Sequence, residues 1–120
     1  MIQAYPARST TPELEEHLIR IQGAATSDPV NETARGVVVT RTGTGAFLIT
    51  WAEDPGTYVL ASCGLEAATP GDIAGHTVVF DTYDTAGTQA FILYNAADAA
   101  HDLATAEYIN IRVAFKRTGV

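Results

Sequence analysis

Cysteine is almost absent from this chain, which limits both its cross-links and its chemistry. Cys63 is the one cysteine in 120 residues, so no disulfide can form within the chain. It follows an apolar run that begins at Tyr58, where a small buried side chain is the better interpretation. A nucleophilic cysteine needs a base partner, and the sequence nominates none.

Basic residues and long apolar runs are scarce as well. Seven Lys and Arg residues stand against fourteen Asp and Glu residues, which gives a formal net charge of −7. Nucleic-acid binding depends on neutralising phosphates with basic side chains, so we expect no nucleic-acid partner. No apolar run approaches the roughly 20 residues that span a membrane, and the first residues lack the regions of a secretory signal. We therefore expect no membrane partner and synthesis in a cytosol.

Side-chain groupings for catalysis or metal binding are also missing from the sequence. The histidines lack metal-ligand spacing and are interpreted as exposed polar side chains; they are His17, His76 and His101. The acidic pairs lack the alternating pattern of a calcium loop and fit turns and helix caps; they are Asp81 with Asp84 and Asp98 with Asp102. We therefore expect no enzymatic activity, no cofactor and no metal site.

Strand-forming patterns, in contrast, fill most of the chain. The expected strands are rich in β-branched and aromatic residues and cover residues 16–23, 36–42, 46–51, 58–65, 76–83, 89–95 and 107–117. Glycine-containing links at 43–45 and 84–87 predict two tight hairpins. In the second strand of the first hairpin, Phe47, Ile49 and Trp51 share the bulkier face, which we expect to be the core side.

These elements predict a mostly β fold in one domain. We expect an antiparallel β-sandwich or flattened barrel of about seven strands, formed by residues 16–120. Residues 1–15 are expected to form an extended N-terminal arm. One short helix is expected within residues 96–106, where helix formers dominate, with Asp98 as its cap and Leu103 as its anchor.

Seven short blocks are spaced along most of the chain. The blocks are Arg20 to Gly23, Gly36 to Gly45, Ile49 to Trp51, Asp54 to Thr57, Thr69 to Asp72, Thr77 to Asp81 and Val113 to Lys116. In order and spacing they are similar to the decoration, or cement, proteins of tailed-bacteriophage heads. The resemblance implies a structural virion protein that is made in the host cytoplasm and then binds the outside of the capsid, with the major capsid protein as its partner. We further hypothesise that copies of the chain form homotrimers at local three-fold positions and stabilise the capsid by clamping neighbouring capsid subunits.

The N-terminal arm lies outside this resemblance. It is apolar and carries prolines, and we hypothesise that Ile2, Tyr5 and Pro6 anchor it on a neighbouring subunit. A frayed terminus without function is the alternative for this segment. For the whole chain the alternatives are a tail protein, either a tail-tube subunit or a fibre-associated adhesin domain, and a host-derived interaction module with no phage role.

Overall fold

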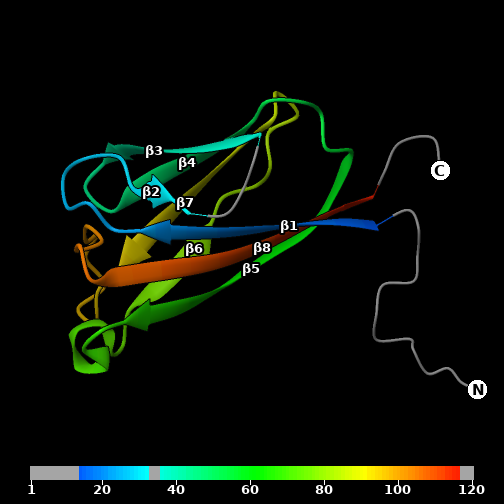
Figure 1. Cartoon of the computed structure of the whole chain (residues 1–120). Helices are drawn as coiled ribbons and strands as arrows, with labels where there is room; N and C mark the ends of the chain where they lie inside the picture. The colour runs from blue at the N-terminus through cyan, green and yellow to red at the C-terminus, as the bar shows by residue number, and fades with distance from the viewer. Residues whose placement is uncertain (1–13, 33–35, 117–120) are drawn as a thin grey trace, which may run out of the picture.

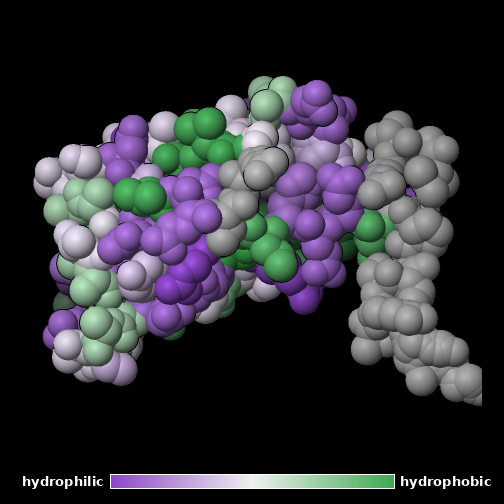
Figure 2. All heavy atoms as spheres, viewed as in Figure 1, coloured by the Kyte–Doolittle hydropathy of each residue, from purple (hydrophilic) through white to green (hydrophobic). Residues whose placement is uncertain are grey.

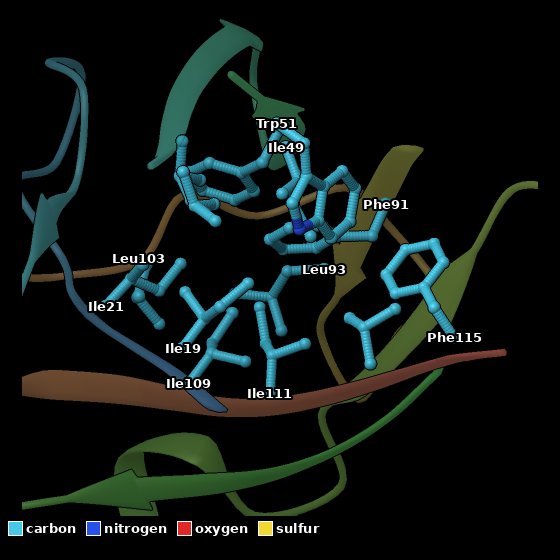
Figure 3. Packing of buried hydrophobic residues seen from close by; sticks show 14 residues of the cluster. Ile19, Ile21, Ile49, Trp51, Phe91, Leu93, Leu103, Ile109, Ile111 and Phe115 are labelled. Carbon is cyan, nitrogen blue, oxygen red and sulfur yellow. The ribbon is translucent and has the colours of Figure 1, made fainter. Parts of the chain in front are cut away.

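The computed structural model of the protein describes residues 14–32 and 36–116 and contains two antiparallel four-stranded sheets (Figure 1). The first sheet, in spatial order, comprises β2 (Val30–Asn31), β1 (Leu14–Gln22), β8 (Glu107–Lys116) and β5 (Thr57–Ala67). The second comprises β3 (Val37–Gly43), β4 (Ala46–Trp51), β7 (Thr88–Tyr94) and β6 (Thr77–Phe80). Apolar side chains of both sheets meet between them, which confirms the predicted mostly β, sandwich-like fold (Figure 3).

The core follows the alternation of the strands. The inward side chains of β8 are at most 2% exposed, and they are Ile109, Ile111, Val113 and Phe115. Phe47, Ile49 and Trp51 of β4 face them from the second sheet, as predicted from their shared parity. Burying one such side chain stabilises the fold by roughly 1.5–3 kcal/mol, so this row of contacts holds the two sheets together.

Both predicted hairpins are present. The β3–β4 turn places Gly43 opposite Ala46, and Gly45 adopts a φ of +67° that side-chain-bearing residues rarely tolerate. The β6–β7 connection is closed by a bridge between Asp84 and Thr88. The chain is thus reversed at the two places where glycine-containing links predicted it.

The predicted helix within residues 96–106 is wrong. Asp98, expected as its cap, adopts a left-handed φ of +61°, and Tyr94 forms an isolated bridge with Ala100. The Asn95 side chain accepts hydrogen bonds from the backbone N–H groups of Ala97 and Ala99. These local bonds compete with helix formation, so the segment forms turns instead. The helical element of the described residues is a 3₁₀ turn, η2 (Pro70–Ile73).

Strand boundaries also differ from the prediction at the N-terminal end. Leu14 and Glu15 belong to β1 and pair with Lys116 and Phe115, so they are not part of an arm. Their pairing partners lie about 100 residues away in the chain. A local sequence pattern does not reveal such a distant pairing. β2 is an additional strand, too short at two residues to show a pattern. The predicted anchors Ile2, Tyr5 and Pro6 lie outside the described residues.

Candidate interaction surfaces

Within its described strands, the outer face of the second sheet carries no charged side chain. The strand register and the alternating burial place its members on the side away from the core: Val38, Thr40, Ala46, Leu48, Thr50, Thr77, Val79, Thr88, Ala90, Ile92 and Tyr94. We call this surface the neutral face. Val38 is 58% exposed and Val79 is 52% exposed, at the two edge strands. A surface without charge is unusual on a chain whose net charge is −7.

The opposite outer face, on the first sheet, carries a cluster of paired charged and polar side chains, and also the exposed Leu18 (64%). The Arg20 guanidinium donates to Glu66 at 2.7 Å, to Asn110 at 2.9 Å and to Glu32 at 3.1 Å. It also lies over the Tyr108 ring, 4.1 Å from the centroid. Figure 2 shows two hydrophilic areas over β1 and β8, with a hydrophobic patch between them.

Mutual pairing shifts the acid–base behaviour of this cluster. Hydrogen bonds from Arg20, and then from Asn110, hold the pKa of Glu66 below its ordinary value. The hydrogen bond to Glu66 raises the pKa of Arg20 further above its ordinary value. Both groups therefore stay charged and bonded to each other. Their side chains link the three neighbouring strands β1, β8 and β5.

The histidines are less exposed than predicted. The Trp51 indole N–H donates to His17 Nδ1 at 3.3 Å, and His17 Nε2 lies 2.9 Å from Glu15 Oε2. Because Nδ1 accepts the hydrogen bond from the indole N–H, the imidazole hydrogen is on Nε2, which donates a hydrogen bond to Glu15. The rings of His76 and His101 meet edge to face at 5.2 Å. All three rings are half-buried, so the exposed-side-chain interpretation is wrong.

Cys63 is also placed differently from the prediction. It is exposed, although its apolar neighbours in sequence favoured burial. Its parity on β5 points it inward, opposite Ile111, but β5 extends beyond the cover of the second sheet. Partial burial of the thiol raises its pKa, and this makes it a poor nucleophile.

A groove opens beside Cys63, between β5 and β6. It has a volume of about 690 Å³, and its apolar lining includes Cys63, Leu65, Ala67, Ile73 and Val78. The two strands that border it are the edge strands of the two sheets. The groove is therefore the open side of the sandwich.

The described part of the chain contains no group of three or more His, Cys, Asp or Glu residues arranged to hold a metal ion. Within the same residues, no helix has the length and apolar character needed to cross a bilayer.

No family model, curated protein or solved structure matches this chain. The functional argument therefore depends on the surfaces themselves. Sequence reasoning missed the neutral face, although its signal was present. In the strands between Val38 and Thr50, and again in those between Thr77 and Tyr94, every residue at the outward parity is uncharged.

Proposed function

We propose that the protein is a structural virion protein that binds the outside of a tailed-phage capsid and stabilises it by clamping neighbouring capsid subunits. The observation that carries the proposal is the neutral face, because a docking surface must give up its water. Charged groups are depleted from the centres of protein interfaces, since burying an unpaired charge costs several kcal/mol. On an acidic molecule, an uncharged sheet face is the surface that docks at least cost.

The size of the neutral face favours a contact that is repeated over a lattice. Four strands about 4.8 Å apart, with about six residues each at roughly 3.3 Å per residue, give a face of roughly 400 Å². A stable interface of standard size buries about 800 Å² on each partner. The flat outline of the neutral face is smaller than that accessible area. A second contact, on a neighbouring subunit, would add to it, as a clamp requires.

The remaining parts of the proposal follow the resemblance. The major capsid protein is the partner, three copies form a homotrimer at a local three-fold position of the capsid, and the protein is made in the host cytoplasm before it joins the capsid surface. The runner-up is a tail protein, either a tail-tube subunit or a fibre-associated adhesin domain. A β-sandwich serves both roles, so the binding experiment has to separate them.

The test is co-sedimentation of the purified protein with phage heads that lack it. We expect saturable binding of the natural sequence. The double variant Val38→Asp with Val79→Asp should bind at least tenfold more weakly, because it places two carboxylates on the neutral face. Both positions are already more than half exposed, so the fold tolerates the change. The matched control is Ala68→Asp, which adds a carboxylate at an exposed position outside that face.

Three results would overturn the proposal. Equal binding of the double variant and the control would remove the neutral face from the interface. Absence of binding to heads, with rings or tubes forming in the free protein, would indicate a tail-tube subunit. Binding to a host glycan in place of heads would indicate an adhesin domain.

A further inference from the structure

The strand β5 forms a long edge that no described strand covers. It runs over eleven residues, pairs with β8 on one side, and has no strand on the other side among residues 14–32 and 36–116. The other three edges of the sandwich are shorter or interrupted. β2 has two residues, β6 has four, and β3 carries a bulge at Arg41 and Gly43. β5 is therefore the longest of the four edge strands and is open to a further strand.

Residues that usually protect such an edge are missing from β5. Natural edge strands avoid unwanted pairing by means of lysine, proline, bulges or short length. β5 has neither lysine nor proline, and its one register shift lies near its start, between Tyr58 and Leu60. From Leu60 to Ala67 its one charged residue is Glu66, which is bonded to Arg20. A regular stretch of about eight residues thus presents unpaired backbone groups.

The groove beside β5 points to the same missing neighbour. Leu65 and Cys63 project from β5 toward the space in front of Ile73 and Val78. The second sheet ends at β6 and leaves these side chains without full cover. A strand added to β5 would carry its own inward side chains over this groove. One partner would therefore both hydrogen-bond to the backbone groups at the edge of β5 and cover the apolar surface next to it.

We infer that two copies of the protein pair through β5, antiparallel and about a two-fold axis, so that the two four-stranded sheets become one continuous sheet. An antiparallel edge is its own complement under a two-fold axis, because each copy offers the donors and acceptors that the other needs. A second copy of the same chain therefore fits this edge without any further sequence requirement. This inference stands independently of the proposed capsid role.

Symmetry restricts the register at the centre of the contact. A two-fold axis normal to the sheet keeps side chains on their own face, so one residue of β5 must lie opposite itself. The middle of the regular stretch from Leu60 to Ala67 lies between Cys63 and Gly64, and we place Cys63 at the centre of the contact because its side chain faces the groove. With Cys63 as the centre, Glu66 lies opposite Leu60 of the other copy, and the two Glu66 carboxylates lie roughly 20 Å apart. The pairing therefore brings no like charges together.

The first measurement is molecular mass by sedimentation equilibrium over a range of concentrations. We expect a monomer–dimer equilibrium for the natural sequence. Gly64→Lys should weaken the dimer at least tenfold, because its two copies place ammonium groups diagonally across the new pair of strands. The backbone accepts this change, since a Cβ at Gly64 meets nothing within 4 Å. Gly43→Lys, also an open position but in the β3–β4 hairpin, is the matched control and should leave the mass unchanged.

The second measurement uses Cys63 as a reporter. Antiparallel neighbours have Cα atoms about 4.5–5.5 Å apart, which is within the range that a disulfide spans. Added diamide should accept two electrons and two protons from the two thiols and leave an S–S bond between the copies. A control protein with Cys63→Ser and Thr85→Cys, whose cysteine is also at an exposed position, should cross-link much more slowly at the same concentration.

Three outcomes would overturn the inference. A mass that stays monomeric at every concentration would exclude the dimer. A dimer or trimer that Gly64→Lys leaves unchanged would place the contact on another surface. Equal cross-linking of the Cys63 protein and the Thr85→Cys control would show random collision in place of a centred pair.

Discussion

The Arg41 guanidinium and the Asp102 carboxylate form a two-pronged ion pair, with Nε–Oδ1 at 2.9 Å and Nη2–Oδ2 at 3.0 Å. Asp102 also accepts a hydrogen bond from the backbone N–H of Gly45 at 2.8 Å. The pair joins the β3–β4 hairpin to the segment that precedes β8. Leu103, next in sequence to Asp102, is 1% exposed, so the ion pair holds a residue that closes the core.

The first prediction concerns acid stability. The hydrogen bonds from Arg41, with a smaller contribution from the Gly45 N–H, hold the pKa of Asp102 below its ordinary value. A group whose pKa is lower in the folded state adds stability above its unfolded pKa and loses it as the pH falls through the folded pKa. Asp102→Asn should therefore be less stable than the natural sequence at pH 7, and the difference should shrink below about pH 4.

Urea unfolding from pH 7 to pH 2 measures this difference. Asp72→Asn, which changes an exposed carboxylate on η2, is the matched control and should follow the natural sequence. A gap between Asp102→Asn and the natural sequence that stays constant over the whole range would contradict the prediction.

The second prediction concerns the turn of the first hairpin. A Cβ on Gly45 would lie 2.5 Å from the backbone nitrogen of His101 and 2.8 Å from the carbonyl oxygen of Leu93. For a residue with a side chain, the left-handed φ of +67° also costs about 1–2 kcal/mol of conformational energy in the folded state. Gly45→Ala should therefore lower the free energy of unfolding by at least about 2 kcal/mol.

The control for this prediction lies in the same hairpin. A Cβ added at Gly43 would meet no atom within 4 Å, and the φ of Gly43 is not left-handed. Gly43→Ala should change the free energy of unfolding by less than about 1 kcal/mol. Equal effects of the two substitutions, measured by thermal or urea unfolding, would show that close packing on Gly45 does not constrain the turn.

The strands could be predicted from sequence because a period of two is a local property. The alternation in 109–115 and the parity of Phe47, Ile49 and Trp51 needed no information beyond the segments themselves. Sheet order could not be predicted in this way, since β1 and β8 pair across most of the chain. The false helix at 96–106 has a local and a long-range cause. Hydrogen bonds to the Asn95 side chain compete with helix formation, and the contacts of Asp102 with Arg41 and of Leu103 with the core override local propensity.

The candidate surfaces were harder to predict than the strands. The apolar run before Cys63 favoured burial, but β5 lies at a sheet edge, and a run alone does not reveal whether both faces are covered. The neutral face is formed by four strands that lie side by side. The sequence shows that each strand has uncharged residues at its outward positions, but the strand register is needed to show that these residues form one surface.

The third prediction concerns the aromatic end of the core. The Phe115 ring is fully buried and meets Trp51 and Tyr83 at 5.2 Å and Tyr58 at 6.0 Å, edge to face. Phe115→Ala removes these contacts and leaves a cavity, so it should cost about 3–5 kcal/mol of unfolding free energy. Val79→Ala, at an exposed apolar position, should cost less than about 0.5 kcal/mol. Comparable losses in urea unfolding would mean that this ring does not join the two sheets.

The last prediction separates the N-terminal arm from the neutral face. β1 begins at Leu14, so deletion of residues 2–12 should leave the thermal midpoint of unfolding nearly unchanged. If Ile2, Tyr5 and Pro6 anchor the arm on a neighbouring capsid subunit, the same deletion should weaken co-sedimentation with heads at least tenfold. Replacing the three anchors by serine should reproduce that loss, whereas Gln3→Ala should not. Undiminished binding of the deleted protein would take the arm out of the interface and leave the neutral face as the contact to be mapped.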